Sequence, residues 1–125
     1  LDTLQPPDEI LVMADLSRSV AAHIALSNAA REGARYAASH PSDVVGIKNR
    51  ALLEYNNSGL RFTGMELRYE NITILYPNGS WDPGSLVRVE TNCRFPLFLG
   101  GFFPEPMVDV NGNLPLRGEA EMVIL

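Results

Sequence analysis

The sequence predicts an α+β fold in which a long N-terminal helix and a second, shorter helix pack on one face of a small antiparallel sheet of about three to four strands. Apolar residues recur at helical spacing early in the chain and at every second position later on. Because the strands follow the helices and do not alternate with them, we expect antiparallel pairing, with one sheet face against the helices.

The long helix is expected over residues 8–39. Asp8 and Glu9 place negative charge at its N-terminus, and Pro41 ends it because the residue before a proline resists the α conformation. At 1.5 Å per residue this helix is on the order of 48 Å long, so we expect one end to project from a domain of this size.

The composition of this helix changes along its length, from bulky apolar residues in its first half to small residues in its second half. Small residues that step by three or four and lie along one face form a candidate helix-packing interface: Ala22, Ala25, Ala29, Gly33 and Ala37. Such a face lets another backbone approach closely. The partner is either the domain's own sheet or another subunit.

The second helix is expected over residues 43–55, with Ser42 or Asp43 as its cap. The polar run at 56–59 then breaks the chain. We expect the sheet, with its connections, to occupy residues 65–125.

Three segments of the later part alternate in the manner of strands. The first spans 65–76, where the alternation slips by one residue and predicts a bulge near Glu70 and Asn71. The second spans 86–95, and the third spans 116–125. The core-facing residues of the last two strands are expected to be Val87, Val89, Thr91, Cys93 and Phe95, followed by Leu116, Gly118, Ala120, Met122 and Ile124.

The segment 96–113 is long for a loop and rich in apolar side chains. It either folds over the open edge of the core or forms a contact patch for a neighbouring subunit or a membrane surface. The candidate contact residues are Phe98, Leu99, Phe102 and Phe103.

Charge and composition narrow the classes of function. A net charge of −5 argues against a nucleic-acid partner, because phosphate binding needs clustered Lys and Arg. No stretch approaches the roughly 20 consecutive apolar residues of a membrane span. Residues 1–9 have the composition of a linker or a non-native start, and residues 10–125 are expected to form a single domain.

The residues that could carry chemistry are scattered along the chain. His23 and His40 have no neighbours at metal-ligand spacing, and Cys93 is expected to be a small core residue. The run from Asp109 to Asn113 resembles the start of a calcium loop but lacks the glycine and the glutamate that such a loop needs. We therefore expect no catalytic, cofactor-binding or metal-binding residue, no cofactor and no small-molecule substrate.

The second half of the long helix resembles the signature of the TadE-like family, in which a helix ends in an AAREGARYA-type stretch. The matching residues follow Ala29 without a gap and are Ala30, Arg31, Glu32, Gly33, Ala34, Arg35, Tyr36 and Ala37. Downstream only the general pattern agrees, with a short helix, alternating strands and an apolar loop.

The resemblance implies a non-enzymatic minor pilin, or pseudopilin, of the tight-adherence (type IVc) pilus at the cell envelope. It implies pilin subunits, the pilus assembly machinery and a membrane as partners, the membrane being reached through an N-terminal helix. The sequence departs from the family at residues 1–9, where a long apolar span is expected, so we expect that anchor to have been removed. The alternatives are an adhesin-like binding module built on Tyr76, Trp81 and Phe102–Phe103, and a small hydrolase.

Overall fold

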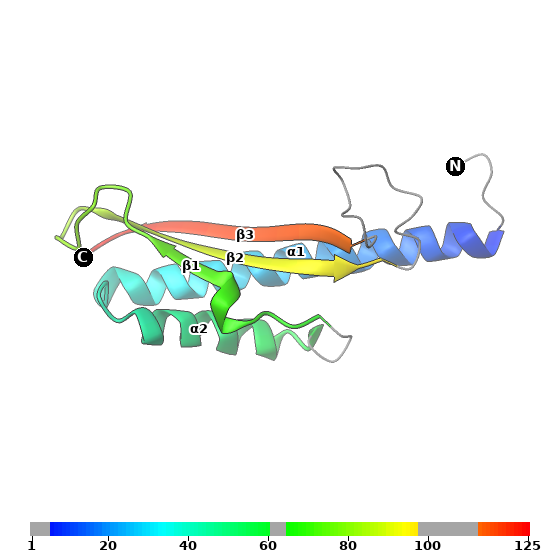
Figure 1. Cartoon of the computed structure of the whole chain (residues 1–125), viewed down its shortest axis with the longest axis horizontal. Helices are drawn as coiled ribbons and strands as arrows, with labels where there is room; N and C mark the ends of the chain where they lie inside the picture. The colour runs from blue at the N-terminus through cyan, green and yellow to red at the C-terminus, as the bar shows by residue number, and fades with distance from the viewer. Residues whose placement is uncertain (1–5, 61–64, 98–112) are drawn as a thin grey trace.

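The computed structural model describes residues 6–60, 65–97 and 113–125 and confirms the predicted α+β fold (Figure 1). Two helices pack against a three-stranded antiparallel sheet of order β1-β2-β3, so β2 is the central strand. The elements are α1 (Pro6–Ser39), α2 (Val44–Asn57), the short 3-10 turn η2 (Tyr69–Asn71), β1 (Ile72–Leu75), β2 (Leu86–Pro96) and β3 (Asn113–Val123).

α1 agrees with its predicted range to within two residues and ends two residues before Pro41. Its C-terminal half lies against α2 and the sheet, and its N-terminal end extends past the sheet (Figure 1). The expected projecting end is therefore the N-terminal one.

α2 begins after the predicted cap. The Gly46 amide donates to the Asp43 carboxylate at 3.1 Å, and the Tyr36 hydroxyl donates to the same carboxylate at 2.6 Å. These two hydrogen bonds tie the end of α1 to the start of α2, and they lower the pKa of Asp43, the Tyr36 bond being the larger cause. α2 then buries Ile47, Ala51 and Tyr55 against α1 and the sheet.

β2 confirms the predicted alternation, since all five of its expected core residues are buried. β3 differs from its expected bounds because it begins at Asn113, inside the segment predicted to be a loop. Pairing with Pro96 extends the ladder to that residue. Met122 is 38% exposed although it was expected in the core, because it lies near the end of the strand, where Ile124 takes the buried position.

The first predicted strand is largely wrong. Only Ile72–Leu75 pairs with β2, and the slip in alternation is the 3-10 turn η2, not a bulge. The Asn71 amide donates to the Arg68 carbonyl at 2.9 Å and closes this turn. Met65 and Leu67 are buried as the alternation predicted, although their segment lies outside the sheet, because burial alternates in any extended chain that runs along a core.

Candidate functional site

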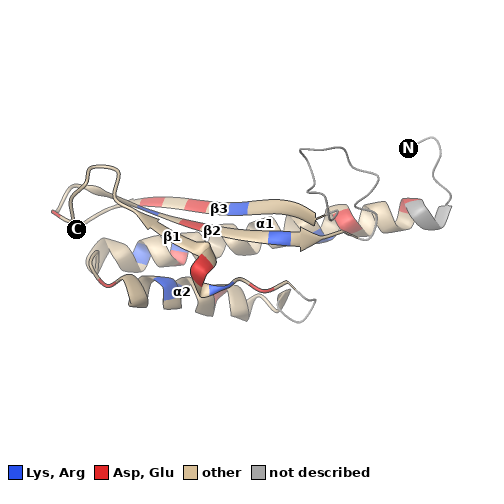
Figure 2. Ribbon diagram, in the orientation of Figure 1, with Lys and Arg blue, Asp and Glu red and all other residues tan. Residues whose placement is uncertain are grey.

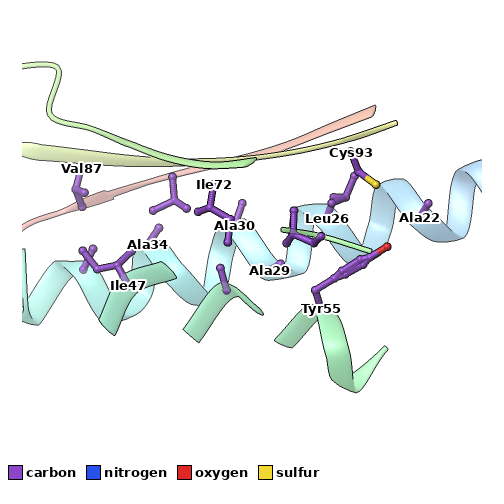
Figure 3. Packing of buried hydrophobic residues seen from close by; sticks show 14 of the residues in the cluster. Ala22, Leu26, Ala29, Ala30, Ala34, Ile47, Tyr55, Ile72, Val87 and Cys93 are labelled. Carbon is purple, nitrogen blue, oxygen red and sulfur yellow. The ribbon is translucent and has the colours of Figure 1, made fainter. Parts of the chain in front are cut away.

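The predicted helix-packing interface lies inside the domain. All five of its residues are buried, and a Cβ added at Gly33 would lie 3.3 Å from Val89 and 3.4 Å from Ala51. Figure 3 shows the neighbouring small residues of α1 between α2 and the sheet. The close partner of this face is therefore the chain's own sheet together with α2.

The family-signature residues divide between the core and the surface. Ala30 and Ala34 are buried with Gly33, whereas Arg31 and Arg35 are exposed. Arg35 forms an i,i+3 ion pair with Glu32 at 3.7 Å, and Arg31 donates to Asn28 at 3.2 Å.

Tyr36 lies near the end of the signature stretch and joins it to the next turn. Its ring stacks on His40 at 4.4 Å, and the Arg50 guanidinium lies 4.9 Å from the ring centroid. Together with the hydrogen bond to Asp43, these contacts give Tyr36 a structural role at the α1–α2 junction.

The predicted contact loop lies outside the described residues. This includes Phe98, Leu99, Phe102 and Phe103, together with Asp109 and Asn111 of the calcium-like run. In the described part of the chain, no group of three or more His, Cys, Asp or Glu side chains could hold a metal ion.

A polar cavity of about 850 Å³ opens beside Cys93, and it was not predicted. Its lining combines Glu66, Arg68, Glu70, Asn71, Asn92, Cys93, Arg94, Pro115 and Leu116. Burial raises the pKa of the Cys93 thiol, whose S–H group donates to the Glu66 carbonyl at 3.5 Å. A buried, protonated thiol is a poor nucleophile, and among the described residues that line this cavity the candidate bases are the carboxylates of Glu66 and Glu70.

The aromatic pair proposed for an adhesin-like site lies elsewhere. Tyr76 and Trp81 meet edge to face at 6.1 Å, and the Tyr76 hydroxyl donates to the Pro41 carbonyl. Neither residue lines the polar cavity. Tyr76 therefore anchors the turn before β2 to the turn between α1 and α2, and Trp81 is left partly exposed beside it.

The most unusual surface feature is a row of large apolar side chains on the N-terminal half of α1. They are 52–68% exposed, and we call them the exposed stripe: Ile10, Met13, Leu16, Val20 and Ile24. Figure 2 shows few charged residues on this half of the helix. The sequence indicated bulky residues here, but not that they would face outward.

Two charged residues of this half, Asp15 and Arg18, lie away from the stripe. Asp15 is almost fully buried and forms an i,i+3 ion pair with Arg18 at 3.5 Å. The Arg18 guanidinium in turn lies 4.8 Å from the centroid of the Phe95 ring. The two charges therefore face the domain, and the apolar side chains face outward.

Comparisons with protein-family models, with curated proteins and with solved structures found no match. What the structure shows is a fold, a long apolar N-terminal helix packed on a three-stranded antiparallel sheet, with the shape of a pilin.

Proposed function

We propose that this chain is a non-enzymatic structural subunit, a minor pilin of a bacterial tight-adherence pilus, whose sheet domain lies on the extracytoplasmic side of the membrane. The observation that carries the proposal is the exposed stripe on a helix whose other half is built into the domain. A contiguous apolar row on a charged, acidic protein usually marks a contact with other protein or with lipid.

Assembly supplies a physical reason for the stripe. Burying one large apolar side chain contributes roughly 1.5–3 kcal/mol, so a stripe of five supports packing against neighbouring helices. Over Glu9–Ser39 the helix is also long and apolar enough to cross a membrane, although core helices of soluble proteins can meet the same two criteria. A row of apolar side chains suits both the membrane before assembly and a helical filament core after it.

The partners in this proposal are other pilin subunits, the assembly machinery and the membrane. The family signature supports the choice of the tight-adherence system. In the described residues its small members hold the domain together, so we assign the contacts with other subunits to the exposed stripe and not to the signature.

The proposal is tested with two matched substitutions in the cell that encodes the chain. Val20 and Leu53 are 59% and 57% exposed, and both are apolar residues on helices. Val20→Glu charges the stripe, whereas Leu53→Glu places the same charge on α2. We expect surface filaments and adherence to be lost with Val20→Glu and kept with Leu53→Glu, at equal levels of the two proteins.

Two results would contradict the proposal. One is normal filaments and adherence in cells that lack the chain altogether. The other is a purified chain that turns over a substrate and loses this activity when residues of the polar cavity are replaced.

A further inference from the structure

The connection between β1 and β2 contains an Asn-Gly pair, Asn78 and Gly79. In this pair the side-chain amide of Asn78 is followed by a main-chain nitrogen that no side chain crowds, because glycine has no Cβ. The nitrogen of Gly79 is a nucleophile once it loses its proton, and the side-chain carbonyl carbon of Asn78 is an electrophile. The sequence therefore places two groups that can react with each other on adjacent residues.

The fold holds both of these groups in hydrogen bonds. The Gly79 amide donates to the Tyr76 carbonyl at 2.8 Å and closes a turn in which Gly79 has a φ of 67°. The side-chain oxygen of Asn78 accepts from the Leu86 amide at 2.9 Å, which holds this side chain against the first residue of β2. For the two groups to react, the Gly79 amide must release its proton and the Asn78 carbonyl carbon must reach the Gly79 nitrogen. Both hydrogen bonds therefore oppose the reaction.

The ends of this connection are fixed as well. The Tyr76 hydroxyl donates to the Pro41 carbonyl, and the Gly84 amide donates to the Ile124 carbonyl at 2.8 Å. The Asn-Gly pair itself is exposed, so the water and the solvent base that the reaction needs can reach it. The reactants are thus all present, and the geometry of the connection restrains them.

We propose that Asn78 is a self-modification site, whose reaction with Gly79 is held back by the two hydrogen bonds and proceeds when the connection opens locally. In the first step a bond forms between the Gly79 nitrogen and Cγ of Asn78, and the Cγ–Nδ2 bond breaks. The side-chain nitrogen leaves as ammonia with the proton that the Gly79 amide gives up, and a cyclic imide remains. Water then opens the imide at one of its two carbonyl carbons and yields either aspartate or isoaspartate at position 78. This site is independent of the pilin assignment.

The two products are expected to change the turn differently. Aspartate keeps an oxygen that can accept from the Leu86 amide, and it adds one negative charge. Isoaspartate routes the main chain through its Cβ and so adds one atom to the turn that Tyr76 and Gly79 close, and we expect their hydrogen bond to be lost. Trp81, the single tryptophan of the chain, packs edge to face on Tyr76 at 6.1 Å, so its fluorescence emission reports this change.

The experiment follows the loss of Asn78 by mass spectrometry in the full chain at neutral pH, both folded and unfolded in urea. Cleavage after arginine releases residues 69–88 as one peptide, apart from the other Asn-Gly pair of the chain, Asn111–Gly112. The same peptide contains Asn71 as an internal control, because the branched side chain of Ile72 crowds the nitrogen that would attack it.

The expected result is a reaction that the fold slows. Asn78 should react at least about tenfold more slowly in the folded chain than in urea, because the reaction follows the population of the open connection. In urea it should react far faster than Asn71. A synthetic peptide of residues 74–82, measured with and without urea, corrects for the effect of urea on the chemistry.

Two substitutions of Leu86 separate its N–H group from its side chain. Leu86→Pro removes the donor to Asn78 at the first residue of a strand, where proline is accepted, whereas Leu86→Ala keeps the donor and shortens the side chain. In the folded state we expect Leu86→Pro to react about fivefold faster than Leu86→Ala. If circular dichroism shows that Leu86→Pro does not fold, Tyr76→Phe provides the test. It releases the connection from Pro41 and should speed the reaction about fivefold relative to the wild type.

Several outcomes would overturn the proposal. They are equal rates at Asn78 in the folded and the unfolded chain, no reaction at Asn78 in urea, and equal rates in the two folded Leu86 variants. Where Leu86→Pro does not fold, equal rates in Tyr76→Phe and the wild type would overturn it. Unchanged Trp81 emission in the purified isoaspartate form would contradict the predicted change in the turn.

Discussion

The two halves of α1 use apolar residues in opposite ways. In the C-terminal half the small side chains, such as Ala29 and Gly33, are fully buried, because α2 and the sheet approach the helix backbone. In the N-terminal half the larger side chains, such as Met13 and Val20, are mostly exposed. The half with less apolar surface thus forms part of the core, whereas the larger apolar side chains of the other half face outward.

This difference shows that the core half of α1 needs side chains small enough for neighbouring backbones to approach it closely. A large apolar area on each side chain matters less there. A helix packed between a sheet and a second helix gains contacts when its side chains are small, since neighbouring backbones then come near. A helix surface with nothing packed on it has no such limit. Large apolar residues retained on such a surface are best explained by a partner outside the domain.

The largest expected effect comes from adding one methyl group where α1 meets β3. Gly118→Ala would place a Cβ 2.3 Å from the Leu26 carbonyl group, which cannot move without displacing the helix. We expect a loss of about 3 kcal/mol in the free energy of unfolding, measured by urea denaturation. Glu119→Ala, on the solvent side of the same strand, is the control, and an unchanged midpoint for Gly118→Ala would contradict the backbone contact.

A smaller effect is expected at the α1–α2 contact. Gly33→Leu should lower the free energy of unfolding by about 1–3 kcal/mol, because its side chain has only the space next to Val89 and Ala51. In Gly33→Ala, the gain of about 1 kcal/mol in helix propensity offsets the tight 3.3 Å contact. The melting temperature of Gly33→Leu should therefore lie well below those of the wild type and Gly33→Ala. Equal stability of all three would mean that this face is loosely packed.

Next comes a pH-dependent effect in the core. The buried Tyr55 hydroxyl donates to the Met65 carbonyl at 2.9 Å, and burial raises the pKa of Tyr55. A raised pKa contributes stability that is fully present below the unfolded pKa of about 10 and is lost as the pH rises above it. Tyr55→Phe should cost about 1–2 kcal/mol at pH 7, because it leaves the Met65 carbonyl without this donor.

The pH profile provides the check on Tyr55. Urea midpoints of the wild type should fall from pH 9 to 11, and those of Tyr55→Phe should fall less. Part of the fall should remain in the variant, because burial also raises the pKa of Cys93. Parallel profiles for the two chains would show that Tyr55 does not titrate with unfolding.

The smallest effect on stability is expected in the exposed stripe. Val20→Glu should change the free energy of unfolding by less than about 0.5 kcal/mol, as is usual for surface positions, and Leu53→Glu should behave alike. Urea denaturation of the two variants sharpens the contrast between the halves of α1. A loss of several kcal/mol for Val20→Glu alone would show that the stripe is covered within the domain.

Local patterns in the sequence were sufficient for much of the fold. Pro41 ended α1, Asp43 capped α2, and strict alternation placed Val87 and Phe95 in the core. These features depend on backbone sterics and on periods of 3.6 and two residues, so they can be predicted without knowledge of the neighbours.

The errors arose where a neighbour decides the outcome. The segment before Ile72 alternates like a strand, yet η2 turns it out of the sheet. β3 continues back to Asn113 because Pro96 lies opposite that residue in β2. The polar cavity and the position of β3 at the edge of the sheet depend on contacts between distant parts of the chain, so no local pattern indicates them.

By itself, the sequence determined the order of the two helices and the sheet, the end of α1 at Ser39 and the buried face of β2. Only the tertiary structure decided which side of α1 the sheet covers, which strand remains at the edge and which apolar residues stay exposed. The physical reason is that propensity and periodicity act along the chain, whereas burial depends on which segments pack together in space.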